Sequence, residues 1–142
     1  MALVAVVGAG AWGTALAYHL GAHGVPVRLW VRRAERAKQL AITRENELLL
    51  GVRLPVGVEV SHDLERVVAA ASTVVFATPC DTLRAIAELV RPLISPEAIV
   101  VSAAKGIENG TLLLTTHVLP FWIASVLLTV GLIGAIVIAR EE

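Results

Sequence analysis

The stretch Leu3-Val4-Ala5-Val6-Val7-Gly8-Ala9-Gly10-Ala11-Trp12-Gly13-Thr14 decides the fold of this chain. Its first five residues form a continuous apolar run, which is typical of a strand buried on both faces of a parallel sheet. The glycines that follow are spaced G-x-G-x-x-G, and the Ala- and Leu-rich residues 14–20 predict a helix directly after them. The order of strand, glycine turn and helix predicts an α/β fold that binds a dinucleotide.

Each glycine of this motif has a separate expected role. Gly8 permits a tight turn at the end of the strand, and Gly13 lets the helix lie close against the sheet. Gly10 lacks a Cβ, so the backbone can approach a pyrophosphate, which the helix N-terminus attracts through its N–H groups and dipole. Glycine-rich turns are common, so the motif supports dinucleotide binding only together with the strand and the helix beside it.

Composition narrows the possible functions. The 142 residues are enough for one domain with a core, and 12 basic and 12 acidic residues give no net charge that would favour nucleic acid. The single cysteine, Cys80, excludes an internal disulfide and fits a reducing compartment. No metal site is expected, because His19 and His23 have no third ligand at a suitable spacing. The first residues lack the basic segment of a secretory signal.

Alternating strands and helices predict a Rossmann-type, doubly wound parallel sheet with the strand order 3-2-1-4-5. Gly21 and Gly24 are expected to end the first helix, and residues 46–55 are expected to form a loop with an apolar patch. Asp63 and Ser61 are candidate caps for the third helix, and Asp81 or Thr82 for the fourth. The expected strands are residues 3–7, 25–31, 56–60, 73–77 and 99–102, and the expected helices are residues 14–20, 34–43, 64–70 and 83–93.

The end of the second strand indicates which cofactor is bound. Domains of this type that bind NAD carry an acid there for the ribose hydroxyls, whereas this chain has Arg32 and Arg33, and its first acid is Glu35. Two arginines can hold a 2′-phosphate through charge-assisted hydrogen bonds, so the sequence favours NADP over NAD. The alternative is that both arginines lie on the solvated start of a helix.

The carboxyl ends of the fourth and fifth strands should face the same crevice. They carry Thr78-Pro79-Cys80 and Lys105 respectively, and Cys80 is expected to be a small buried apolar residue. Lys105 follows a strand expected to be buried, so its ammonium could meet a phosphate or a reacting carbonyl. It could equally be a surface lysine on a loop.

Four motifs of the chain are informative together, namely residues 8–17, Leu29-Trp30-Val31-Arg32-Arg33, Leu50-Gly51-Val52-Arg53-Leu54-Pro55 and Ala104-Lys105-Gly106-Ile107-Glu108. Through these motifs, residues 1 to about 114 resemble the cofactor domain of bacterial NAD(P)-dependent glycerol-3-phosphate dehydrogenase. This family reduces dihydroxyacetone phosphate with NAD(P)H to make the glycerol phosphate of membrane lipids. The resemblance implies that Lys105 contacts both cofactor and substrate, and that Ala11 stands where the family often has a serine. The implied cofactor-binding residues are Gly8, Gly10, Ala11, Trp12, Gly13, Arg32, Arg33 and Lys105.

Length is the main departure from this family. The family has a helical second domain with a general-base lysine, and the 142 residues contain no counterpart of it. A ketone bound here would have no proton relay and no closed, dry site. We therefore expect a truncated enzyme, with a dinucleotide-binding domain over residues 1–114 that binds the cofactor without turnover.

The remaining residues, 115–142, are expected to form an apolar C-terminal helix. Residues 121–139 are nineteen uncharged, mostly apolar residues that end at Arg140, and about twenty such residues span a bilayer. Phe121 and Trp122 suit an interfacial belt. These features predict a transmembrane helix that attaches a cytoplasmic head to the inner membrane.

This tail also resembles the last transmembrane helix of subunit J of bacterial NADH-quinone oxidoreductase. The matching residues are Leu119-Pro120-Phe121, residues 124–128, and residues 134–137 with Ala139-Arg140. The resemblance implies an alternative function, in which the chain is a non-enzymatic membrane subunit or anchor. Deleting the residues after Leu119 would separate the two readings.

Overall fold

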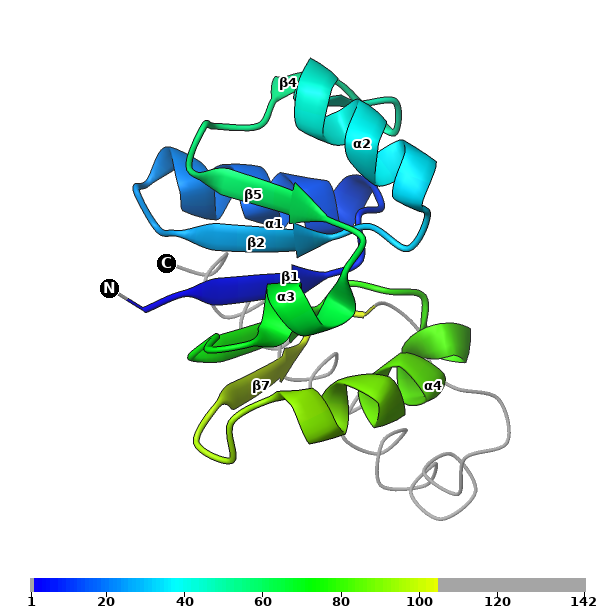
Figure 1. Ribbon diagram of the computed structural model, residues 1–142. Helices are drawn as coiled ribbons and strands as arrows, with labels where there is room; N and C mark the ends of the chain where they lie inside the picture. Colours follow the sequence, from blue (N-terminus) through cyan, green and yellow to red (C-terminus); the bar gives the residue numbers. More distant parts are fainter. Residues whose placement is uncertain (1, 105–142) are drawn as a thin grey trace, which may run out of the picture. The chain divides into compact units, whose positions relative to one another are not determined.

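A computed structural model describes residues 2–104 of the chain, all of which belong to one compact unit. Within these residues, five parallel strands form one sheet in the order β5-β2-β1-β6-β7 (Figure 1). The order 3-2-1-4-5 predicted from the sequence is therefore confirmed. The strands are β1 (Val4–Val7), β2 (Val27–Trp30), β5 (Val58–Ser61), β6 (Thr73–Phe76) and β7 (Ile99–Ser102).

Helices connect these strands. Because each connection crosses a face of the sheet, the next strand runs parallel to the one before it, and Val4 of β1 pairs with both Val27 and Thr73. Asp63 caps α3 as expected, since its carboxylate accepts from the N–H of Arg66. The helices are α1 (Ala11–Ala22), α2 (Ala34–Thr43), α3 (Leu64–Val68) and α4 (Cys80–Val90), followed by a 3₁₀ turn over Arg91–Leu93.

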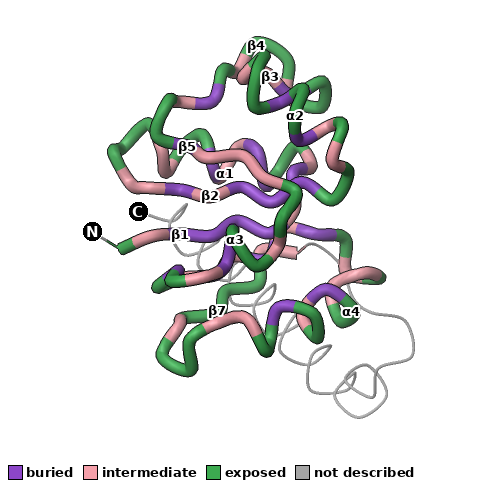
Figure 2. Tube along the Cα trace, in the orientation of Figure 1, coloured by how far each residue is buried: buried purple, intermediate pink, exposed green. Residues whose placement is uncertain are grey.

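The core has two layers, one on each face of the sheet. All four residues of β1 are buried (Figure 2), and successive side chains point to opposite faces. Val4 and Val6 pack in the layer that includes residues of α1 and α2, and Ala5 and Val7 pack in the layer that includes residues of α3 and α4. The apolar run in the sequence is explained by this double burial.

β7 differs from the expected buried strand. Within residues 2–104, β7 is an edge strand of the sheet, and Ile99, Val100 and Val101 are 64%, 53% and 41% exposed. Lys105 thus follows an exposed edge strand in the described part of the chain, and not a buried one.

Gly21 does not end the first helix, which continues to Ala22. A Cβ at Gly21 would lie 2.5 Å from Cγ2 of Val58, so this glycine allows α1 to pack against β5. Gly24, with φ +78°, lies two residues beyond the helix and adopts the left-handed conformation that ends it. The expectation was correct for Gly24 and wrong for Gly21.

Residues 46–55 are not a simple loop. β3 (Glu45–Asn46) and β4 (Leu49–Arg53) pair as a short antiparallel hairpin. Arg44 fixes the path from this hairpin to β5, because its guanidinium donates to the carbonyls of Leu54, Pro55 and Val58. The start of α4 also differs from expectation, since the helix begins at Cys80 and includes both expected caps.

The contact between α1 and β1 depends on two glycines. Gly8 has φ +118°, and a Cβ on it would lie 2.8 Å from the carbonyl oxygen of Ala77. A Cβ on Gly13 would lie 1.8 Å from the carbonyl oxygen of Gly8 and 3.1 Å from Cβ of Ala77. These two obstacles are backbone and a short side chain, so they cannot move aside as a long side chain could. The roles predicted for Gly8 and Gly13 are consistent with this geometry.

Substitution of Gly13 should therefore destabilise the fold, while substitution of Gly10 should not. We expect Gly13→Ala to lower the free energy of unfolding by about 3 kcal/mol or more through overpacking. Gly10→Ala is the matched control, because no described residue other than its chain neighbours has an atom within 4 Å of its Cβ position, and its cost should be below about 1 kcal/mol. Denaturant unfolding of both variants measures the difference. Equal losses would show that α1 can shift away from β1 at little cost.

Candidate dinucleotide-binding site

The glycine loop connects the carboxyl end of β1 to the start of α1. Gly10 is the N-cap of α1, with φ −71° and ψ −179°, and no side chain caps this helix end. The space around its Cβ position is open to 4 Å, and the next residue, Ala11, is exposed. A helix N-terminus with open space before it can accept an anion, because the dipole and the backbone N–H groups both favour negative charge.

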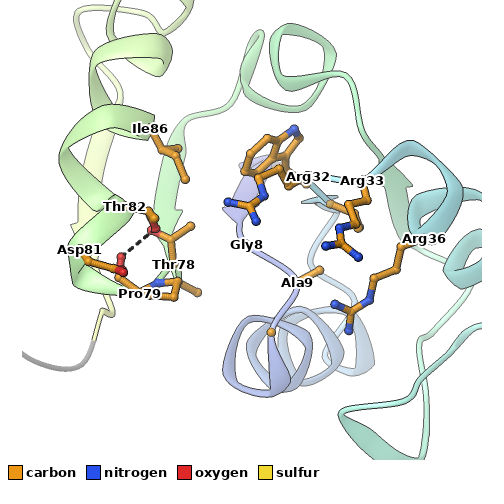
Figure 3. Close-up of a pocket in the computed structure, with 14 residues that line it drawn as sticks. Gly8, Ala9, Arg32, Arg33, Arg36, Thr78, Pro79, Asp81, Thr82 and Ile86 are labelled. Carbon is orange, nitrogen blue, oxygen red and sulfur yellow. Dashed lines mark hydrogen bonds between the residues drawn. The ribbon is translucent and has the colours of Figure 1, made fainter.

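A cavity of about 540 Å³ lies beside this loop, at the carboxyl ends of β1, β2 and β6. Its two walls differ in chemistry (Figure 3): arginines from the start of α2 lie on one side, and the start of α4 lies on the other. The lining residues are Gly8, Ala9, Gly10, Trp30, Val31, Arg32, Arg33, Arg36, Ala77, Thr78, Pro79, Asp81, Thr82 and Ile86.

The first wall is cationic. Arg32 and Arg33 follow β2 and are both exposed, and Arg36 lies one turn further along and is half-buried. Figure 3 shows the three guanidinium groups on the same side of the cavity. This cluster can hold an anionic group through several charge-assisted hydrogen bonds. Arg33 is also the N-cap of α2. The alternative expectation, that the arginines lie at the start of a helix, is therefore correct for where Arg33 lies.

The opposite wall is formed by Thr78 and the first turn of α4. Thr82 Oγ1 donates to the carbonyl of Pro79 at 3.1 Å, which fixes the turn into the helix. Thr78 is 6% exposed, and among the described residues its Oγ1 is a buried hydroxyl without a hydrogen-bond partner. Buried hydroxyls are almost always partnered, so an unsatisfied one in a cavity wall suits a site that holds a polar ligand. Cys80 is half-buried and does not line the cavity.

The remaining predicted site residues lie elsewhere. Trp12 is not among the residues that line the cavity, and its indole Nε1 donates to the carbonyl of Ala103 at 3.1 Å. Trp12 therefore links the start of α1 to the end of β7, on the side of β1 away from the arginines. Lys105 lies outside the described residues. Gly13 is buried under the loop, where its role is packing and not direct contact.

Two polar residues of the site were missed from the sequence. Arg36 lies within the expected helix 34–43 and Asn46 within the expected loop 46–55, and no motif marks either of them. Asn46 is only 2% exposed, and its side-chain amide donates to the carbonyl of Ala9 at 3.1 Å and to Oγ1 of Thr14 at 2.6 Å. It thus joins the hairpin to the glycine loop. The only sequence signal is a small polar residue two positions before the leucine run 48–50.

The described residues contain neither a cluster of metal ligands nor a membrane-spanning helix. In the described part of the chain, no three His, Cys, Asp or Glu residues lie close enough to hold a metal ion. No helix in that part is long and apolar enough to cross a bilayer. The expected transmembrane helix, residues 121–139, lies outside the described residues.

Comparison with known proteins gives a family match. Residues 3–141 match the model of the NAD-dependent glycerol-3-phosphate dehydrogenase N-terminus. The chain is 48% identical over 117 residues to glycerol-3-phosphate dehydrogenase [NAD(P)+] 2 of Mycobacterium tuberculosis, which covers 82% of the chain and 35% of that enzyme. It is 44% identical over 117 residues to the Salinibacter ruber enzyme of the same name, and this match covers 82% of the chain and 34% of that enzyme. The chain thus spans about a third of the length of these relatives.

Solved structures agree on the fold. Glycerol-3-phosphate dehydrogenase from Coxiella burnetii superposes with a TM-score of 0.72 at 24% identity, over 77% of this chain and 34% of that one. The Plasmodium falciparum enzyme gives a TM-score of 0.69 at 23% identity, over 78% and 34%. The family match includes most of the tail. These comparisons do not show a resemblance of the tail to subunit J of NADH-quinone oxidoreductase, and that resemblance stays a hypothesis.

Proposed function

Because this chain belongs to the family of NAD-dependent glycerol-3-phosphate dehydrogenase N-termini, we propose that its α/β domain holds NADPH, and less tightly NADH, between the glycine loop and the arginine wall. The pyrophosphate would lie at Gly10 and the start of α1, and the adenosine half would enter the cavity. The observation that carries this proposal is the open space at Gly10 beside a cavity with three arginines.

The residues present fit such a cofactor. The start of α1 offers a positive dipole end to the pyrophosphate. The wall formed by Arg32 and Arg33 offers cations where a 2′-phosphate would lie, and the hydroxyl of Thr78 has no hydrogen-bond partner among the described residues. When bound, the nicotinamide ring would supply or accept the hydride. This chain's described residues contribute binding and orientation of the other end of the molecule.

Nucleotide titration of the full chain tests the proposal. We expect wild-type protein to bind NADH and NADPH, and Gly10→Ala to bind both at least about tenfold more weakly, because the added Cβ would occupy the space of the phosphates. Fluorescence of the reduced nicotinamide measures binding, and the unfolding experiment above shows whether the variant is folded. A folded Gly10→Ala variant with wild-type affinity would place the pyrophosphate elsewhere.

Binding of the cofactor does not by itself imply that the chain turns over a substrate. We propose dihydroxyacetone phosphate and glycerol 3-phosphate as the substrate pair of the whole enzyme, and Lys105 as a residue that contacts both cofactor and substrate. The match to the relatives that carry this activity in their name covers only 35% and 34% of their length. Adding dihydroxyacetone phosphate to the same titration should therefore leave NADPH unoxidised by these 142 residues. Substrate-dependent oxidation would show that the second domain is dispensable.

The preference for NADP rests on the charge at the end of β2. We expect Arg32→Asp to weaken NADPH binding by roughly tenfold or more and NADH binding by less than about threefold, because only NADPH carries the 2′-phosphate. Arg53→Asp is the matched control, since Arg53 is also exposed but lies outside the cavity. Isothermal titration with both nucleotides measures the ratio. Equal losses for the two nucleotides would remove the argument for a 2′-phosphate site.

We also propose that residues 121–139 attach the domain to the inner membrane, with the cofactor head in the cytoplasm. The support is their composition, nineteen uncharged and mostly apolar residues that precede Arg140. The full chain should float with phospholipid vesicles in a density gradient. A chain that ends at Leu119 should stay in the soluble fraction and still bind NADPH. A full chain that remains soluble would instead make these residues part of the folded domain.

A further inference from the structure

Arg36 differs from the other two arginines of the cavity in how it is held. It is half-buried in the first turn of α2, while Arg32 and Arg33 are exposed. Its Nη2 donates to Oδ1 of Asn46 at 2.9 Å. A guanidinium has five N–H donors, so this single bond leaves most of the fork available to a ligand. Figure 3 shows the Arg36 guanidinium on the cavity side of its helix, below that of Arg33.

Asn46 holds its own orientation independently of Arg36. Its Nδ2 donates to the carbonyl of Ala9 and to Oγ1 of Thr14, and its Oδ1 accepts from the backbone N–H of Leu48 at 3.0 Å. A backbone carbonyl can only accept and a backbone N–H can only donate, so the amide cannot be reversed. Its oxygen must therefore face Arg36.

This arrangement connects the two parts of the cavity that would meet phosphate. Ala9 belongs to the glycine loop and Thr14 to the first turns of α1, whereas Arg36 belongs to the arginine wall. One buried amide thus fixes the glycine loop and one arginine relative to each other. An arginine that is already held loses less conformational freedom when it binds an anion than an exposed one does.

We propose that Arg36 is the pre-positioned cation for the 2′-phosphate of NADPH, and that Asn46 is the positioning residue that orients it. This inference rests on the proposed nucleotide binding. It adds a determinant of cofactor choice that lies outside the Arg32-Arg33 pair. Through the glycine loop, Asn46 would affect the binding of both NADPH and NADH. Through Arg36, it would affect the preference for NADPH over NADH.

The test is the ratio of NADPH to NADH affinity in the full chain. Arg36→Gln removes the charge but keeps a donor for Asn46, so the hairpin should stay anchored. We expect Arg36→Gln to weaken NADPH binding by roughly tenfold or more and NADH binding by less than about twofold, since the charge-assisted bonds to the 2′-phosphate are lost. Lys38→Gln is the matched control, because Lys38 is exposed on the same helix and outside the cavity, and both affinities should be unchanged.

A double-mutant cycle separates positioning from general structural damage. Asn46→Ala should lower the ratio of NADPH to NADH affinity in the wild-type background and leave it unchanged in the Arg36→Gln background. If Asn46→Ala does not fold, Asn46→Ser, which can still donate one hydrogen bond, replaces it in the same cycle. An equal change of the ratio in both backgrounds would show that Asn46 does not act through Arg36.

The outcomes distinguish this inference from the proposed function. A wild-type chain that binds neither nucleotide would overturn the proposed function. If the wild-type chain binds NADH, and the Arg36→Gln variant has the same ratio of NADPH to NADH affinity as wild type, only the role of Arg36 is overturned. Equal weakening of NADH and NADPH by Arg36→Gln would place Arg36 at the pyrophosphate, which also contradicts the 2′-phosphate assignment.

Discussion

The close contact between α1 and β1 is the constraint on which the rest of the site depends. The position of a Cβ on Gly13, only 1.8 Å from the carbonyl oxygen of Gly8, shows that the helix and the end of the strand touch through backbone. This contact points the N-terminus of α1 at the space in front of Gly10. It also brings Ala77, at the end of β6, against the same loop. A helix displaced by the width of a methyl group would lose all three relationships together.

A second constraint comes from the hairpin, which has little core of its own. β3 and β4 are short, and Leu48 and Leu50 are 55% and 79% exposed, so apolar burial contributes little to its position. Hydrogen bonds hold it instead, through Arg44 at one end and Asn46 at the other. Polar anchors of this kind are directional, so they set geometry more sharply than apolar contacts do. The hairpin is therefore well suited to orient a neighbouring side chain.

The sequence was sufficient for the features that depend on local patterns. The apolar run 3–7, the glycine spacing and the alternation of strands and helices determine the sheet, because double burial and right-handed crossovers leave few other arrangements. Arg32 and Arg33 could be placed at the cavity because they follow a strand directly. In these cases the relevant neighbours are close in the chain or fixed by the topology.

The features that were missed depend on contacts between distant segments. The packing role of Gly21 is set by Val58, which is 37 positions further along, and Asn46 meets Ala9 across a similar separation. β3 and β4 are too short to show a clear alternation of apolar and polar residues. Burial of a single asparagine has no periodic signature. Each of these features follows from the tertiary structure and not from the residue types alone.

The strand order explains why the cavity lies on one side of the loop. The chain passes from β1 outward through β2 to β5 and then returns to β6 beside β1, so the loops after β1 and β6 diverge and leave a crevice. The ends of β2 and β6 then supply its two walls, with arginines on one and the Thr78 hydroxyl on the other. Trp12 donates its indole N–H to the carbonyl of Ala103 on the far side of β1. Under the proposed function, the phosphate end of the dinucleotide would be recognised on the arginine side of β1 and its reacting end would lie on the other side, with the loop at Gly10 between them.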